Sequence, residues 1–514
     1  MSGPWQIPQS WAWVESREIA AIVGGGTPRT DDPTNFEGGD VPWITPADLS
    51  GYKDKYISRG ARNITRKGLN NSGARLMPEG AVLFSSRAPI GYVAIASNPV
   101  STNQGFKSFV LRPFIRPDYA YYYLQKAKDL AVKLSSGTTF REISGARAAL
   151  IPFPVAPVAE QERIVAEIEK QFTRLDAAVA ALKRIQVNLK RYRAAVLKAA
   201  CEGRLVPTEA ELARREGRSY EPASVLLERI LAERRSRWED NQVAKFRSTA
   251  KLPRDSTWKA KYKEPLAPDA RTCSELPEGW VWCTADEACS QITDGEHIQP
   301  PYTESGFPLL SAKHVRFGFV TLEGAGTITR GDFDQALARC APRENDLLIV
   351  SVGATTGRAA VVGSLPEFAI VRSVLLLKTL IDPNYFWAWT QGPDCQTWIK
   401  QASGATAQPH LYIKDTMRML VPLPPKNEIL RIAAELSRRF SVTDEVQIQL
   451  ETDQKRAERL RQSVLKRAFE GKLVPQSPKD EPASILLERI RTERPIKPVS
   501  LRKRSTGLEA VHGH

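Results

Sequence analysis

The chain has 514 residues, of which 42% are hydrophobic and 25% charged, so its composition is that of an ordinary globular protein and excludes a largely disordered chain. Its 73 Lys and Arg against 58 Asp and Glu give a formal net charge of +15, which favours a polyanionic partner such as a nucleic acid. It has no apolar run of about 18 residues, no secretory signal and no regular framework among its six cysteines, so we expect a cytoplasmic protein with reduced thiols and no membrane contact.

An internal repeat organises the chain. Glu221–Ile230 recurs as Glu481–Ile490 with nine of the ten residues identical, which is far beyond coincidence. Further matches pair Val196–Pro207 with Val464–Pro475, Trp11 and Trp13 with Trp280 and Trp282, and Ser136-Gly137 with Ser403-Gly404. The molecule is therefore predicted to be two copies of one plan, in which a variable block precedes a charged helical block.

The variable blocks, residues 1–155 and 276–424, are predicted to be mixed α/β modules rich in strands. Short apolar runs such as Val82–Phe84 have the length of a strand and are separated by Gly, Pro, Asn and Ser. Each block ends in a proline-rich segment, Ile151–Pro154 or Val421–Pro424, and helices commonly begin just after such a segment.

The helical blocks, residues 156–207 and 425–475, carry apolar residues at the seven-residue spacing of a coiled coil, more strictly in the first copy than in the second. The predicted seam residues are Ile168, Leu175, Leu182, Leu189, Val196, Leu436, Leu450 and Val464. One such helix alone would expose a long apolar stripe. We therefore expect the two helices to pair as an antiparallel coiled coil, which gives a pseudo-two-fold molecule with one block at each end. The alternative is that each helix docks on its own block.

Residues 208–275 form a separate stretch. Two short helices are expected around Glu209–Glu216 and Ala223–Arg237, and a basic run dotted with aromatic residues follows them. This stretch is either a partner-docking surface or a flexible linker. Residues 476–514 are expected to form a short helix and a basic tail.

Catalytic motifs are not found. Gly353–Arg358 superficially resembles a phosphate loop but lacks the terminal Gly-Lys-Ser/Thr, so we interpret it as a turn after a strand. Pro300-Pro301-Tyr302 is similar to the Pro-Pro-Tyr of adenine methyltransferases, but Gln299 stands where that motif needs Asp or Asn. The five histidines show no metal-ligand spacing. We therefore expect a non-catalytic chain that holds neither a metal nor a cofactor of its own.

The variable blocks do carry side chains suited to reading DNA, because Arg pairs with guanine, Asn and Gln pair with adenine, and Ser, Thr and Lys bind phosphate. In the first block the candidate DNA-binding residues are Asn70, Arg75, Ser85, Arg87, Asn103, Gln104, Lys107, Ser136, Thr138 and Thr139. In the second block they are Lys313, His314, Arg316, Ser351, Arg358, Arg372, Ser403, Thr406, His410 and Lys414. Each one alone could equally be an ordinary solvated residue, but two different blocks on one repeated frame suggest two readers.

These residues and their order resemble the specificity subunits of type I restriction–modification systems over essentially the whole chain. The resemblance rests on Ser85–Val93 and Ser101–Lys107 in the first block, Ser403–Thr406 in the second, and the helix starts Glu160–Ile164 and Glu428–Ile432. One departure is that Ser351–Gly357 does not repeat the wording of Ser85–Gly91, so no residue of the second block inherits the role of Arg87 by alignment.

The resemblance implies two target-recognition domains that each read one half of a bipartite site in double-stranded DNA, joined by two helices that set the spacing. It also implies a bacterial or archaeal complex with two methyltransferase subunits and with restriction subunits. S-adenosylmethionine, ATP and Mg²⁺ then belong to those partners, and DNA methylation is carried out by the complex. The alternatives are a stand-alone sequence-specific DNA-binding regulator and a module that holds a partner without reading sequence.

Overall fold

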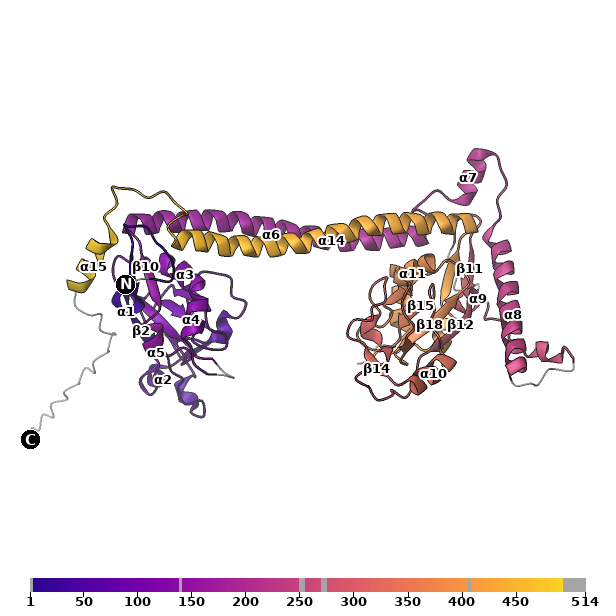
Figure 1. Ribbon diagram of the computed structural model, residues 1–514, viewed down its shortest axis with the longest axis horizontal. Coiled ribbons are helices and arrows are strands. Elements are labelled where there is room, and N and C mark those ends of the chain that lie inside the picture. Colours follow the sequence, from indigo (N-terminus) through magenta and orange to yellow (C-terminus); the bar gives the residue numbers. More distant parts are fainter. Residues whose placement is uncertain (1–2, 138–140, 249–254, 270–274, 405–407, 493–514) are drawn as a thin grey trace, which may run out of the picture. The chain divides into compact units, whose positions relative to one another are not determined.

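The computed structural model describes residues 3–137, 141–248, 255–269, 275–404 and 408–492. The chain divides into two units, the first formed by Met1–Lys183 with Glu451–His514 and the second by Arg184–Leu450. Each unit contains one mixed α/β block and parts of the same two long helices (Figure 1), which confirms the predicted fold class.

The block of the first unit is built from short strands with small helices between them. Its elements are β1 (Ala12–Glu15), α1 (Ser16–Ile19), β2 (Ala20–Gly24), η1 (Pro33–Asn35), β3 (Val41–Ile44), η2 (Pro46–Leu49), β4 (Tyr56–Ile57), β5 (Arg62–Ile64), α2 (Arg66–Asn70), β6 (Val82–Phe84), β7 (Val93–Ala96), β8 (Ser101–Thr102), β9 (Lys107–Leu111), α3 (Pro117–Lys126), α4 (Lys128–Leu134), α5 (Gly145–Ala148) and β10 (Pro152–Val155). The strands form a five-stranded sheet in the order β2-β9-β6-β7-β4 and a three-stranded sheet in the order β5-β3-β8.

The block of the second unit repeats this plan. Its elements are β11 (Val281–Thr284), α9 (Ala285–Ala288), β12 (Cys289–Asp294), β13 (Phe307–Leu310), η5 (Ala312–His314), β14 (Gly326–Ile328), α10 (Arg330–Arg339), β15 (Leu347–Val350), β16 (Ala359–Val361), β17 (Ala369–Ile370), β18 (Val374–Thr379), α11 (Pro383–Gln391), α12 (Pro393–Ala402), α13 (Ile413–Met417) and β19 (Leu420–Leu423). The sheets run β12-β18-β15-β16 and β14-β13-β17, the same order as in the first block, with a single parallel bridge from Gly318 to Ala360 of β16 in the place of β4.

The proline-rich ends of the blocks are strands. β10 pairs antiparallel with β1, so that Trp13 lies opposite Pro154, and β19 pairs with β11, so that Trp282 lies opposite Pro422. Proline is tolerated there because each ribbon has only two strands and therefore only edges. Each ribbon brings the beginning and the end of its block together immediately before a long helix.

The long helices are α6 (Val158–Cys201) and α14 (Lys426–Phe469), each of 44 residues. In the first unit Asp176 of α6 forms an ion pair with Arg461 of α14, and in the second unit Arg193 pairs with Asp444 and donates to Thr443 Oγ1 at 3.0 Å. A step toward the start of α6 is thus a step toward the end of α14, so the helices are antiparallel.

The predicted seam residues follow the inner side of this pair. Ile168, Val196, Leu436, Leu450 and Val464 are buried, while Leu175, Leu182 and Leu189 are half-buried. Burial of the seam is not confined to the helix ends, because Leu450 lies midway along α14. The polar Gln186 and Gln447 are also half-buried at seam positions.

The end of each long helix packs into the core of the block in its own unit. In the first unit the last residue of α14, Phe469, contacts the rings of Tyr119 and Tyr123 of α3 at centroid distances of 5.3 and 5.2 Å. In the second unit Cys201, the last residue of α6, is buried in the same cluster as Tyr385 of α11. Each block therefore closes its core with the helix that begins at the other block.

The repeated segment after each long helix then returns to the first strand of that block. Helix α15 (Ala483–Thr492) begins where the Ala483 amide donates to the Ser10 carbonyl at 2.9 Å, and α8 (Ala223–Ser248) begins where Ala223 donates to Gly279 at 2.8 Å. The short helix α7 (Glu209–Glu216) has the predicted bounds, but α8 continues beyond the predicted Arg237. The segment after Arg237 contains no Gly or Pro that would end the helix.

A glycine at the end of α14 tests this closure. Gly471 has φ +67°, and a Cβ there would lie 2.2 Å from Pro8 Cγ, so Gly471→Ala forces a clash in addition to the left-handed strain. Gly38 has φ +68° with nothing within 4 Å, so Gly38→Ala carries the strain alone, about 1–2 kcal/mol. We expect Gly471→Ala to lower the thermal unfolding midpoint by several degrees more than Gly38→Ala. Equal midpoints would mean that Pro8 does not pack on this turn.

Candidate nucleic-acid interface

The first candidate surface is formed by the loop that follows β6. Ser85 is buried, and its hydroxyl donates to the Pro89 carbonyl at 2.7 Å and accepts from the Tyr92 amide at 2.8 Å. Ser86 is also buried. These serines hold the loop in place, and the Arg87 side chain, 40% exposed, is presented to solvent.

Glu142, which the sequence did not single out, connects several of the predicted residues. Its backbone pairs antiparallel with both Arg87 and Ser136. Its carboxylate lies 3.7 Å from Arg87 Nη1 and 3.5 Å from Lys107 Nζ. A carboxylate shared between two cations at these distances orients both, and Arg87, the more exposed of the two, remains available to a ligand.

The neighbouring loop adds two amides to this surface. The Asn103 side chain accepts from the Gly105 amide at 2.9 Å and thus shapes the loop, while Gln104 is exposed and accepts from the Thr27 hydroxyl. Lys107 Nζ donates to the Gln104 carbonyl at 3.2 Å. Five predicted residues, Arg87, Asn103, Gln104, Lys107 and Ser136, are thereby brought together.

Two further predictions in this block lie on a different loop. Asn70 ends α2 and Arg75 lies shortly after it, and both side chains are exposed. Thr138 and Thr139 lie outside the described residues.

The second candidate surface is a hollow of about 530 Å³ in the block of the second unit. It is lined by four predicted residues, Ser351, Arg372, His410 and Lys414, together with Asp294, His297, Leu375, Leu411, Tyr412 and Ile413. Ser351 is buried and donates to the Arg372 carbonyl at 3.1 Å, so it supports the wall of the hollow.

One side of the hollow carries a charged cluster that sequence reasoning missed. Asp294 accepts from Arg339 Nη2 at 2.7 Å and lies 3.0 Å from His297 Nε2. The other side is aromatic and basic, because the Tyr412 ring lies 4.0 Å from that of His410 and Lys414 Nζ lies 5.7 Å from the Tyr412 ring. The hollow is therefore lined by hydrogen-bonding groups of both negative and positive charge.

The remaining predicted residues of the second block lie outside this hollow. Lys313 Nζ donates to the Gly324 carbonyl at 3.0 Å. His314 is buried, its Nδ1 accepts from the Ser311 amide at 2.9 Å, and burial lowers its pKa, so a neutral ring braces this loop. Arg316 on the same loop is exposed.

Two more predicted residues have supporting positions. Arg358 Nη2 donates to the Ala312 carbonyl at 2.7 Å, and burial lowers the pKa of this guanidinium. Ser403 is buried and donates to the Ile399 carbonyl at 2.7 Å. These groups stabilise loops rather than face the hollow. Thr406 lies outside the described residues.

Backbone hydrogen bonds place the two surfaces at the same position in the two folds. The Ser86 amide donates to the Gly105 carbonyl as the Ser351 amide donates to the Ser373 carbonyl. In the same way the Glu142 amide donates to the Ser136 carbonyl as the His410 amide donates to the Ser403 carbonyl. The bridge between Arg87 and Glu142 corresponds to that between Val352 and His410. The equivalent pairs are therefore Ser86 with Ser351, Arg87 with Val352, Gln104 with Arg372, and Glu142 with His410.

The equivalent positions share their backbone but differ in what they can bind. Arg and Gln prefer guanine and adenine, and Glu accepts from cytosine, so the two surfaces present different hydrogen-bonding patterns. The equivalence could have been found in the sequence only by extending the match of Ser136-Gly137 with Ser403-Gly404 to residues 142 and 410. The two loops differ in amino-acid sequence, and only the backbone hydrogen bonds fix how their residues align.

Other kinds of site are not seen in the described part of the chain. Within the described ranges, no group of three or more His, Cys, Asp and Glu residues is arranged to hold a metal ion. In the same ranges, no helix is both long and apolar enough to cross a membrane. The five cysteines described there are unpaired and buried.

Comparisons with known proteins agree with this architecture. Residues 8–190 match the family described as type I restriction modification DNA specificity domain. The chain is 43% identical over 162 residues to the type I restriction enzyme MjaIX specificity subunit of Methanocaldococcus jannaschii, a match covering 31% of this chain and 37% of that protein. It is 25% identical over 508 residues to the EcoBI specificity subunit of Escherichia coli, covering 96% of this chain and 94% of that protein.

A solved structure has the same fold. It comes from work on complex assembly and conformational transition of the type I R-M system, and it aligns with a TM-score of 0.57 at 18% identity, covering 91% of this chain and all of that one. Residues 8–190 thus match the DNA specificity domain of type I restriction–modification systems, and nearly the whole chain is similar to the specificity subunits of type I restriction enzymes.

Proposed function

We propose that this chain reads a bipartite site in double-stranded DNA, one half with each block, and that it is the non-catalytic specificity subunit of a type I restriction–modification complex. The observation that carries the proposal is the equivalence of the two surfaces. The backbone positions that carry Arg87, Gln104 and Glu142 in the first block carry Val352, Arg372 and His410 in the second. A repeated frame with different polar side chains is suited to reading two different sequences.

The partners follow from this role. We assign two methyltransferase subunits and restriction subunits to the complex, which works in the cytoplasm. S-adenosylmethionine, ATP and Mg²⁺ are assigned to those subunits, and no cofactor is assigned to this chain. The net charge of +15 of the whole chain favours binding to the DNA backbone.

A stand-alone DNA-binding regulator is the alternative. A regulator binds its site tightly by itself, whereas a specificity subunit gains affinity and activity with methyltransferase subunits. Co-purification with a methyltransferase encoded beside it, followed by DNA binding with and without that partner, distinguishes the two.

The chain alone should carry out no chemistry on DNA. Purified without partners and supplied with S-adenosylmethionine, ATP and Mg²⁺, it should give no methylated adenine, cleaved DNA or ADP. The same DNA incubated with the reconstituted complex provides the positive control. Adenine methylation by the isolated chain would contradict the proposal.

Recognition should divide by block. Arg87→Ala or Gln104→Ala should relax the preference at positions of one half-site only, and Arg372→Ala or His410→Ala at positions of the other. Each lost base contact is expected to cost about 1–3 kcal/mol. Methylation profiling on randomised DNA, with each variant assembled with its methyltransferase, measures the preference at every position.

Arg330→Ala is the matched control, because this exposed arginine pairs with Asp334 on α10, away from the hollow. It should leave both half-sites unchanged. A single substitution that altered both half-sites would argue against separate readers.

The helix pair should act as a ruler between the half-sites. Inserting one heptad in each helix, near Leu182 and Leu450, keeps the seam in phase and adds about 10 Å. At about 3.4 Å per base pair this lengthens the spacer by roughly three base pairs, while the half-sites stay the same because no reading loop is touched. Binding can weaken, since the second half-site is rotated by about a third of a turn.

The methylated motif of the lengthened protein, assembled with its methyltransferase, is the measurement. A five-residue insertion in each helix is the control, because it turns the seam by about 140° out of phase and should abolish assembly or methylation. An unchanged spacer with full activity in the heptad variant would show that another element sets the distance.

A further inference from the structure

The second unit has an extension beside its block that the first unit does not show in the described residues. It consists of α8 from Arg234 onward and of residues 255–268, which include η3 (Thr257–Lys261); we call these residues the arm. Figure 1 shows α8 beside the block, and its residues continue to Ser248, well past the segment Glu221–Ile230 that matches Glu481–Ile490. The arm is thus an addition to the repeated plan.

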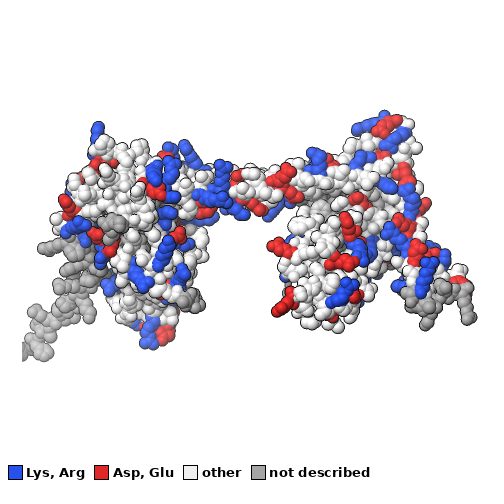
Figure 2. Space-filling model, viewed as in Figure 1, with Lys and Arg blue, Asp and Glu red and all other residues white. Residues whose placement is uncertain are grey.

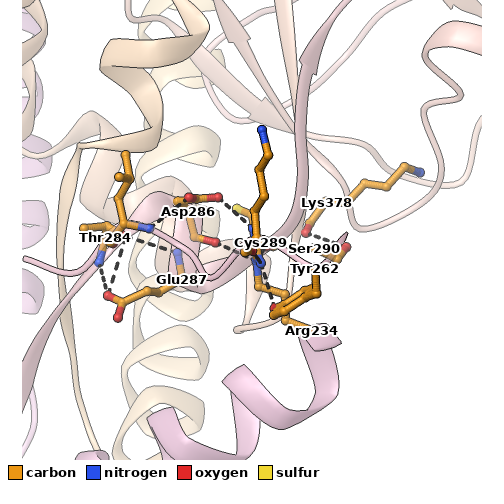
Figure 3. A network of polar contacts seen from close by, with 10 residues as sticks. Arg234, Tyr262, Thr284, Asp286, Glu287, Cys289, Ser290 and Lys378 are labelled. Carbon is orange, nitrogen blue, oxygen red and sulfur yellow. Dashed lines mark hydrogen bonds and ion pairs between the residues drawn. The ribbon is translucent and has the colours of Figure 1, made fainter. Parts of the chain in front are cut away.

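Arg234 anchors the arm to the block. Its side chain is 14% exposed, and Nε donates to the carbonyls of Asp286 and Cys289, both at 3.1 Å. Nη1 donates to Tyr262 Oη at 2.8 Å, and Nη2 donates to Asp286 Oδ1 at 2.9 Å. Figure 3 shows these contacts converging on one guanidinium. Because Arg234 of α8 is nearly buried and bonds both to the block and to Tyr262, it holds both segments of the arm, α8 and residues 255–268, in place.

The anchor is specific to the second unit. Asp286 also accepts from the Leu266 amide at 3.0 Å, so its carboxylate holds both α8 and the end of the arm. The equivalent position in the first block, counted from the residue that precedes α1 or α9, is Arg17. Arg17 is 64% exposed and pairs with Glu15, so an arginine of an arm would meet a like charge there.

Aromatic side chains pack the two segments of the arm, α8 and residues 255–268, against each other. Trp238 of α8 stacks on Trp258 at 5.8 Å and meets Tyr262 edge-on at 5.3 Å, and Phe246 meets Trp258 at 5.6 Å. Trp258 and Tyr262 thus point toward α8. The aromatic side chains are thus used inside the arm, whereas Leu266 near its end is exposed.

The outer side of the arm is basic. Lys259, Lys261 and Lys263 are exposed and lie next to the inward-facing Trp258 and Tyr262. Lys259 pairs with Glu239, and Figure 2 shows Lys and Arg along α8 with acidic residues between them. Lys261 and Lys263 add charge beyond these internal pairs, and they are adjacent to the anchor because the Lys263 carbonyl accepts from Arg234.

We propose that the arm binds backbone phosphates of duplex DNA outside the half-site read by the second block, through Lys261 and Lys263. The proposal rests on the DNA-reading function above. A protein partner is less suited to this surface, because protein interfaces are depleted in lysine and centred on exposed apolar anchors, whereas the aromatic residues here pack inward.

The fold sets the reach of this contact. The anchor lies at Cys289, where β12 begins, and the hollow lies at Asp294, where β12 ends. A strand rises about 3.3 Å per residue, so the anchor is about 17 Å from the hollow, which equals the length of roughly five base pairs of duplex. The proposal places the duplex along this direction, so DNA that ends at the half-site is too short to reach the arm.

The test uses the full chain assembled with its methyltransferase and duplexes that carry the methylated motif. The duplexes extend 0, 5 or 10 base pairs beyond one half-site or the other, and affinity is measured by fluorescence anisotropy at several salt concentrations. Lengthening the flank of the second half-site to 10 base pairs should tighten binding of the unaltered protein by about tenfold, and Lys261→Glu with Lys263→Glu should abolish this gain. The slope of log affinity against log salt should fall by about two, one for each lysine.

Lys472→Glu with Lys479→Glu is the matched control, because both lysines are exposed in the first unit and the change in net charge is the same. It should retain the gain from the second flank. Equal flank dependence in the arm variant and the unaltered protein overturns the proposal, as does a lost gain in the control. Loss of methyltransferase assembly with the flank effect intact would make the arm a protein-docking surface and overturn it too. An unchanged methylated motif in every variant keeps the reading function separate, whereas no motif in the unaltered protein would refute that function itself.

Discussion

Each unit depends on a buried carboxylate in the first turn of a long helix. Glu160 of α6 is 1% exposed and accepts from the Trp11 indole at 2.9 Å, and Glu428 of α14 is fully buried and accepts from Trp280 at 3.0 Å. Burial raises the pKa of both carboxyls. Because a buried charge is costly unless it is fully hydrogen-bonded, the first strand of each block and the start of its helix are held in one geometry.

The same carboxylates hold the segment that returns from the other helix. Gln476 donates to Glu160 in the first unit, and the Glu209 amide donates to Glu428 at 2.8 Å in the second. Three residues further along each helix, Arg163 pairs with Asp480 as Arg431 pairs with Glu209. The two repeat segments therefore differ little because they make equivalent contacts in the two units, whereas the loops that bear Arg87 and His410 are free to differ.

Much of this architecture could be predicted from the sequence, because seven-residue spacing and a near-identical repeat are properties of local sequence. The surfaces proposed to read DNA were harder to predict from the sequence. Ser85 and Ser351 are hydrogen-bonded internally and His314 is buried, and composition alone does not separate such residues from exposed ones. Glu142 and Asp294 form ion pairs with residues distant in the sequence, and their neighbours in the sequence do not predict these contacts. The predicted end of α8 at Arg237 was too early, although residues 238–248 contain no Gly or Pro that would end the helix; Trp258, which follows this segment, also packs on Trp238 of α8.

The sharing of α6 and α14 between the units also determines the order in which the chain can fold as it is made. The second unit is a continuous segment, Arg184–Leu450, so all of its residues are available before α14 is finished. The first unit lacks Phe469, the ring on which Tyr119 and Tyr123 pack, until some 350 further residues have been added. At synthesis rates of about 5–20 residues per second that delay is roughly 20–70 s. The block that is made first must therefore wait with an open aromatic core, while the block that is made second completes its own.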